Sequence, residues 1–265
     1  MILDAFKGFF LLFVILVPLE RFLTFHPQKI FRPGWITDAI YYLTGYLIGR
    51  STLWVISSIL VSYYLKNLIN PNLQNFIANQ SIWLQFIQTI FIAELGYYTA
   101  HRLSHTIPWL WKFHSIHHSS TNLDWLATVR AHPLDQIFVK IAQILPIYIL
   151  GYSQKTLTLF ALFSAFEAFF IHSNLNLKLG FINHIIVTPE IHRWHHNQHP
   201  ETHHKNFAAQ LPIIDIIFRT FYLSPNRKPQ KYGLTQPIPY TYLKQTLYPF
   251  QKLPKTNPKN DQYPL

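Results

Sequence analysis

The sequence contains no cysteine and few charged residues, and both absences restrict what the chain can be. Without cysteine there are no disulfides, thiolate metal sites, iron–sulfur clusters, cysteine nucleophiles or C-x-x-C-H haem attachments. Charged residues make up 12% of the 265 residues, whereas soluble domains carry about 25%. Hydrophobic residues make up 49% and aromatic residues 17%, and Trp and Tyr gather at membrane interfaces. The composition indicates a domain that sits in lipid.

Acidic residues are scarce too, with 11 Asp+Glu against 22 Lys+Arg and a net charge of +11. Nucleic acid is a common partner of so basic a chain. Here the basic residues lie between apolar stretches and in the C-terminal tail, so the expected partner is an anionic membrane surface and not nucleic acid. A glycine-rich dinucleotide fingerprint is absent as well, so we expect no flavin module within the chain.

Three long apolar stretches predict membrane-spanning helices, at residues 5–19, 40–65 and 81–100. The first has no small-residue cleavage site and is expected to be an anchor rather than a signal peptide. Two shorter stretches, 134–150 and 156–171, are separated by a Gly-Tyr-Ser turn signal. They predict a helical hairpin that dips into the membrane and returns.

The charges beside these stretches set the expected orientation. Loop 20–39 carries Arg21, Lys29 and Arg32, whereas loop 67–80 carries no charge. The positive-inside rule then puts loop 20–39 and the histidine-rich region in the cytoplasm, and loop 67–80 outside.

The expected fold class is therefore an all-α integral membrane protein. It has about three spanning helices, a membrane-dipping hairpin and a cytoplasmic, histidine-rich helical cap. Three regions are expected: anchor helices at 1–80, a histidine-motif domain at 81–223, and a basic, proline-rich cytoplasmic tail at 224–265. Within the second region, residues 207–223 predict an interfacial helix.

Nine of the fifteen histidines stand in four clusters. The clusters are His101 and His105; His114, His117 and His118; His172; and His192, His195 and His196. Residues three and four apart share a helix face, so H-x3-H presents two imidazoles to one point and H-x2-H-H presents three. Nine nitrogens are too many for one ion and suit two six-coordinate ions, with the remaining positions open to water or O2.

Several kinds of metal site are compatible with histidine. Imidazole suits iron, copper, zinc and nickel alike. A carboxylate-bridged di-iron bundle needs two E-x-x-H motifs, and this chain has one, from Glu201 to His204. A structural zinc takes four ligands. A non-catalytic zinc carrier or sensor stays as the alternative, although transporter ligands lie near the bilayer midplane rather than at helix ends.

The motifs around these histidines resemble the sterol desaturase and fatty acid hydroxylase superfamily over roughly residues 85–223. They are HRLSH, WKFHSIHHS with LDW, RAHPLD, FIHSN, and TPEIHRWHH followed by NF. The resemblance implies a membrane enzyme that hydroxylates or desaturates a lipid, such as a sterol or fatty acyl chain, with O2 as cosubstrate. It implies two Fe2+ ions on the nine clustered histidines and a separate electron donor, cytochrome b5-like or ferredoxin-like.

The resemblance also implies a role for His132, which matches a further family histidine and is expected to be catalytic, in or beside the metal coordination. Asp124, Asp135, Glu190 and Arg193 are candidates to support the ligands, because a metal-bound histidine usually gives its other N–H to a carboxylate or carbonyl.

Two positions depart from the family pattern. Ala208 follows Asn206-Phe207 where the family usually has glycine, and Asn176 stands where some lipid hydroxylases have another histidine. The second departure leaves open whether one ligand position is filled through water.

Overall fold

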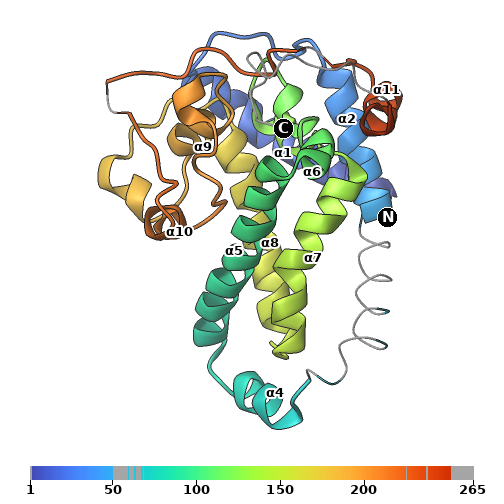
Figure 1. The fold of residues 1–265 in the computed structure, drawn as a ribbon, viewed down its shortest axis with the longest axis vertical. Helices are drawn as coiled ribbons and strands as arrows, with labels where there is room; N and C mark the ends of the chain where they lie inside the picture. Colours follow the sequence, from blue (N-terminus) through green and yellow to red (C-terminus); the bar gives the residue numbers. More distant parts are fainter. Residues whose placement is uncertain are drawn as a thin grey trace.

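The fold is all-helical and elongated (Figure 1), as the sequence predicts. The computed structural model describes residues 2–49, 59, 63, 67, 69–224, 226–236 and 238–251. Within these residues the β pairings are two isolated bridges.

Among the residues described, ten α-helices carry labels that follow the chain. They are α1 (Ile2–Phe22), α2 (Trp35–Thr44), α4 (Pro71–Ala78), α5 (Ile82–Thr106), α6 (Pro108–His114), α7 (Pro133–Ile149), α8 (Gln154–His172), α9 (Pro189–His195), α10 (Pro212–Ile217) and α11 (Tyr242–Leu247). Among the shorter turns are a π-helix, η1 (Gly45–Gly49), and the 3-10 turns η4 (His117–Ser119), η5 (Trp125–Val129), η6 (Gly180–His184), η7 (Pro200–Thr202) and η8 (Tyr248–Phe250).

Helices α5, α7 and α8 form a bundle that runs from the upper end of the molecule in Figure 1 towards α4. Helix α5 contacts both of the others. Gly96 lets α5 approach α7 closely, because a Cβ at this position would lie 2.1 Å from the carbonyl oxygen of Ala142. Ser81 and Ser153 cap the first turns of α5 and α8 with their hydroxyl oxygens. The start of each helix and the spacing between them are thus fixed by local chemistry.

Helices α7 and α8 form the predicted hairpin, with Gly151 in the left-handed region at φ 76° in the connection. Their 17 and 19 residues extend about 25 and 28 Å, slightly less than a hydrocarbon core of about 30 Å. Two charged side chains within the apolar stretches of the hairpin, Lys140 and Glu167, have inward contacts or are buried, as expected. Glu167 is 5% exposed, and Lys140 Nζ donates to Gln143 Oε1 at 2.8 Å. The hairpin is confirmed, and its dip into a membrane stays a prediction.

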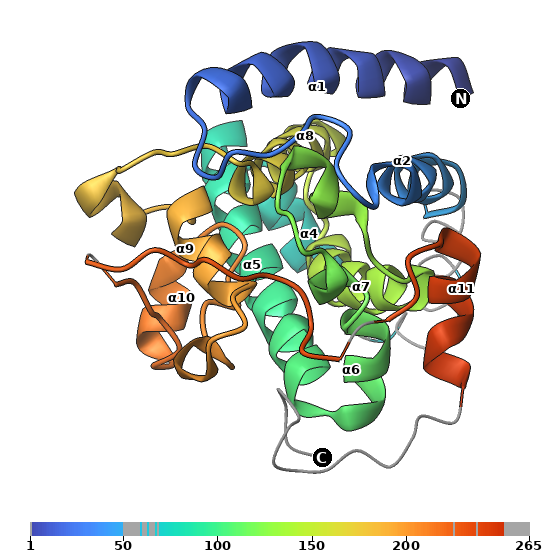
Figure 2. The ribbon, with the colours of Figure 1, turned by 90° about the horizontal axis from the view of Figure 1, so that it is seen from above.

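Two of the described helices, α1 and α8, are long and apolar enough to cross a membrane. Figure 2 shows α1 lying crosswise to the bundle, along one side beyond α8, rather than parallel to α5 and α7. The predicted span at 81–100 lies within α5. The predicted span at 40–65 begins in α2 and falls mostly outside the described residues. The number of crossings therefore stays a prediction.

The three regions expected from the sequence pack into a common core at the cap. Tyr41, Ile116 and Ile238, one from each region, are buried in one cluster. His26 Nε2 lies 2.9 Å from the carbonyl oxygen of Pro229, which ties the loop after α1 to the tail. The proposed boundaries divide the sequence into three regions, but side chains from all three regions pack against one another.

A buried network of two acids and two arginines holds the N-terminal segment against the cap. Asp38 accepts from Arg130 Nε at 2.6 Å and pairs with Arg32 at 2.8 Å. Arg32 Nε in turn donates to Asp124 at 2.7 Å. The four side chains are at most 6% exposed. Removing one member leaves a buried charge without its partner.

We predict that Asp38→Ala lowers the free energy of unfolding by about 3–5 kcal/mol, because two buried arginines lose a carboxylate. Thermal unfolding of the purified protein in detergent measures the loss. Glu201→Ala is the matched control: its pair with Arg227 is half exposed, so the unfolding midpoint should not move. Equal midpoints for Asp38→Ala and the wild type would show that the network does not hold the cap.

Candidate metal centre

All nine clustered histidines lie inside the cap, each at most 8% exposed, and they form two groups. Group one contains His101, His105, His114, His118 and His195. Group two contains His117, His172, His192 and His196. Within each group the nitrogens able to bind a metal lie within 4.8 Å of one another. The structure therefore brings the whole predicted set together.

Each H-x2-H-H motif contributes to both groups, which corrects the expectation that one motif presents three imidazoles to one point. His114 and His118 enter group one, and His117 enters group two. The second motif is reversed: its outer two histidines enter group two, and its middle one, His195, enters group one. In the second motif, which lies on α9 and its C-cap, helix geometry gives the reason. Residues four apart differ by about 40° in direction, whereas a residue three along points about 60° to the other side.

The C-terminal ends of four helices carry histidines of the two groups. Helices α6, α8 and α9 end at His114, His172 and His195, and α5 ends one residue after His105. The last turn of a helix carries partial negative charge on its free carbonyl groups. The backbone around the histidines therefore favours a cation.

Hydrogen bonds to Nδ1 fix the orientation of five rings. Four rings place Nδ1 at 2.7–3.0 Å from a backbone carbonyl oxygen: those of His101, His117, His172 and His195. His114 Nδ1 lies 3.0 Å from Asp135 Oδ2. Because a carbonyl oxygen only accepts, Nδ1 of those four rings carries the proton, and the lone pair of the neutral ring is on Nε2.

The Nε2 atoms of group two face one another closely. Those of His117 and His172 are 3.1 Å apart. Since both carry a lone pair, no hydrogen bond joins them. His192 Nε2 lies 3.0 Å from that of His172 and 3.1 Å from that of His196. Two nitrogens at adjacent positions around one ion, each bonded at about 2.1 Å, are about 3.0 Å apart. The spacing in group two thus fits nitrogens that share a cation.

Group one shows the same need for a cation. The Nε2 atoms of His101, His114, His118 and His195 are buried and have no hydrogen-bond partner among the described residues. Burial lowers the pKa of His118 in this group, and of His117, His192 and His196 in group two, well below the usual value. Neutral imidazole is the form that binds a metal. The residues present therefore fit two metal ions.

His132 lies outside both groups, contrary to its expected place beside the metals. It is the N-cap of α7, where its Nδ1 accepts from the backbone N–H of Leu134 at 3.1 Å. Its Nε2 lies 3.0 Å from the carbonyl oxygen of Thr246, and its ring contacts those of Phe113 and Phe250. Both ring nitrogens are thus engaged in holding α7 and the tail together.

The four side chains expected to support the ligands have different contacts. Asp135 contacts a group histidine directly. Asp124 belongs to the buried ion network. Arg193 donates to the carbonyl oxygen of Ser173 at 2.8 Å, next to the end of α8. Glu190 accepts from an asparagine in η6.

A loop that supports His101 was not found from the sequence. The segment 207–223 was expected to be one interfacial helix, but α10 covers six of its residues. In the loop before α10, the carbonyl oxygen of Phe207 accepts from His101. The carboxylates of Asp215 and Glu94 accept hydrogen bonds from four successive backbone N–H groups of this loop at 2.7–3.1 Å. Two buried carboxylates that look like isolated acids in the sequence thus shape this loop.

The two departures from the family pattern have structural answers. Ala208 is 1% exposed and has no positive φ, so its backbone does not require glycine. Asn176 is exposed, and its backbone N–H donates to the carbonyl oxygen of Leu23 at 2.6 Å. Asn176 is therefore part of the outer surface rather than of either histidine group.

Comparison with known proteins agrees with this site. The fatty acid hydroxylase family matches residues 86–220. An ornithine lipid hydroxylase of Rhizobium tropici is 33% identical over 63% of this chain and 51% of its own length. Alkylglycerol monooxygenases of Danio rerio and Homo sapiens are 34% and 29% identical, over 59% and 78% of this chain and 33% and 45% of their own length. This chain thus spans about half of these relatives or less. No solved structure matches it.

The geometry predicts that His132→Asn keeps its metal, because asparagine also serves as an N-cap. His132→Ala should also keep its metal but lose about 1 kcal/mol of stability with the cap. Metal analysis and thermal unfolding of the two variants measure both effects. Loss of metal from a well-folded His132→Asn protein would restore a direct role for His132 at the centre.

Proposed function

The chain belongs to the fatty acid hydroxylase family, and from this we propose that it is a membrane enzyme that hydroxylates a lipid with two iron ions, O2 and external electrons. One observation supports this most strongly. Nine buried histidines form groups of five and four, and the Nε2 atoms of His101, His114, His118 and His195 have no hydrogen-bond partner among the described residues. With six-coordinate ions, such groups leave positions open for O2.

Iron is the proposed metal because the proposed reaction needs a metal that can activate O2 by redox chemistry. Histidine alone does not select among iron, copper, zinc and nickel. A structural zinc site closes with four ligands, whereas group one alone offers five. The ligands in this proposal are the nine histidines of groups one and two. When bound, the two ions supply the redox chemistry that activates O2.

The protein's own residues hold this chemistry in place. The carbonyl and carboxylate partners of Nδ1 fix the tautomer of these rings and keep their Nε2 atoms directed inward. Burial of all nine rings keeps bulk water away. The overall reaction converts a C–H bond, O2, two electrons and two protons into a C–OH group and water.

We propose a polar membrane lipid as the substrate, hydroxylated on an acyl or alkyl chain. The relatives named as an ornithine lipid hydroxylase and alkylglycerol monooxygenases support hydroxylation over desaturation. The bundle below the histidine groups supports a lipid as well, since Leu95, Leu162 and Phe166 expose apolar side chains on α5 and α8. In the proposed orientation the cap lies in the cytoplasm and the bundle in the bilayer.

The purified protein is expected to hold about two irons per chain and, once reduced, to consume O2 in the presence of lipid. His117→Ala and His195→Ala each remove a ligand from a different group and should lower iron content and abolish turnover. His26→Ala and His199→Ala are the matched controls and should do neither. A single exchangeable zinc without O2 consumption would favour the zinc carrier or sensor.

Cysteine labelling tests the orientation in this cysteine-free chain. Asn72→Cys in α4 should react with an impermeant thiol reagent from outside intact cells, whereas Lys228→Cys in the tail should react after the cells are opened. The reverse pattern would place the cap outside and contradict the proposed cytoplasmic centre.

A further inference from the structure

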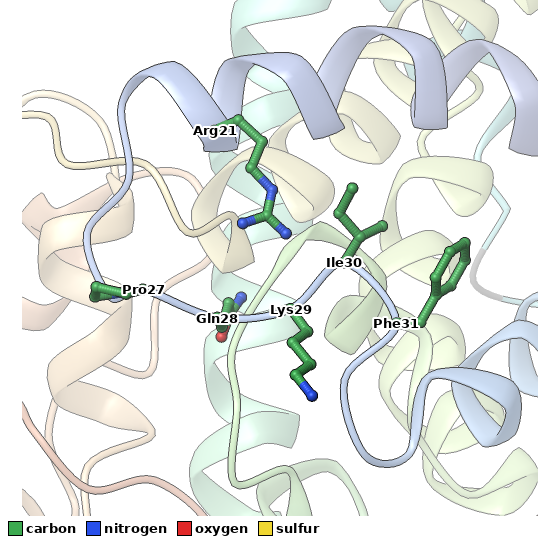
Figure 3. Close-up of a pocket in the computed structure, with 6 residues that line it drawn as sticks. All are labelled: Arg21, Pro27, Gln28, Lys29, Ile30 and Phe31. Carbon is green, nitrogen blue, oxygen red and sulfur yellow. The ribbon is translucent and has the colours of Figure 1, made fainter.

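A hollow of about 590 Å³ opens between the end of α1 and the loop that follows it (Figure 3). Its lining contains Arg21, Pro27, Gln28, Lys29, Ile30 and Phe31. Arg21 and Lys29 are exposed and bring two positive charges to its wall. The family match begins at residue 86, so this hollow lies outside it.

Residues at the floor of the hollow are linked to group two. A recess beneath it is lined in part by Asp124 and Asn174. Asn174 stands two residues after His172. Asp124 belongs to the buried ion network, whose other end, Arg130, accepts Nδ1–H of His117 on its carbonyl oxygen at 3.0 Å. Two ligands of group two are therefore connected to this floor, one along the chain and one by hydrogen bonds.

The surface of the described chain is more basic than the net charge implies. Seven of the eleven acidic residues are buried, whereas three of the 22 Lys+Arg are buried among the described residues. Lys228 is exposed next to the hollow, with its Nζ 5.3 Å from the ring of Phe25. Arg21, Lys29 and Lys228 are called the basic face below.

The basic face points away from the bundle. The loop after α1 and the tail segment 226–236 run across the upper end of the molecule, at the opposite end from α4 (Figure 1). In the proposed orientation the bundle end lies in the bilayer, so a soluble protein is the better-placed partner for the upper end. Redox partners form small, transient contacts, and opposite charges speed their encounter.

We propose that the basic face is the docking surface for an acidic one-electron carrier protein that reduces the centre from the side of group two. This rests on the proposed function. At each encounter the carrier loses one electron and the metal centre gains one, so two encounters supply the two electrons of each hydroxylation.

The experiment uses the iron-loaded full-length protein in detergent. The probes are a reduced soluble cytochrome b5 and a reduced [2Fe–2S] ferredoxin, whose oxidation by the enzyme without O2 is followed by stopped-flow absorbance. For the carrier that reacts with the wild type, Lys29→Glu should lower the second-order rate about tenfold at low salt, and Arg21→Glu/Lys29→Glu further. The rate of the double variant should depend less on salt.

The control charge reversal is Lys155→Glu, an exposed residue at the start of α8 near the far end of the bundle. It should leave the rate unchanged, and dithionite should reduce all variants equally. A wild-type rate in Arg21→Glu/Lys29→Glu, or an equal loss in Lys155→Glu, would overturn the docking site. So would a defect that appears only as a changed requirement for anionic lipid. Failure of the dithionite-reduced wild type to consume O2 with lipid would instead count against the proposed function.

Discussion

The close approach of unprotonated imidazole nitrogens is the constraint on which the rest of the cap depends. His117 and His172 aim lone pairs at each other across 3.1 Å in the buried interior, and such an arrangement is costly unless a cation lies between them. Four helix ends, a row of backbone carbonyls and Asp135 all act to keep the rings in this otherwise unfavourable arrangement. The packing of the cap thus keeps these imidazole nitrogens unprotonated and in position to bind a cation.

The sequence identifies the histidines of the site but does not show how they divide between group one and group two. Spacing identifies all nine histidines and the hairpin that returns His172 to the cap, because H-x3-H, H-x2-H-H and apolar run lengths are local properties. It does not show that His117 and His118 serve different groups, since that depends on where α6 and η4 stand relative to α8 and α9. The hydrogen-bond partners of Nδ1 cannot be predicted from the sequence either, because every residue has a backbone carbonyl that could accept. His132 misleads for the opposite reason: a histidine side chain at an N-cap looks in the sequence like one more ligand.

The part of the chain outside the family match also supports the centre. Glu20 accepts the backbone N–H groups of Trp125 and Asn174, both at 2.8 Å, and so joins the end of α1 to segments on either side of group two. Asp38 does the same for the segment that ends at Arg130. These long-range contacts between residues about 90 to 150 positions apart have no signature in a single sequence. The N-terminal region is thus a structural part of the cap as well as a source of apolar helix.

Because each H-x2-H-H motif contributes histidines to both groups, neither group is held only by segments that serve it alone. A movement of α9 displaces one nitrogen of group one and two of group two together. In the proposed two-metal centre, an ion in one group would restrain the helix that completes the other group, and by linkage the effect would be mutual. Uptake of the two ions would therefore be cooperative.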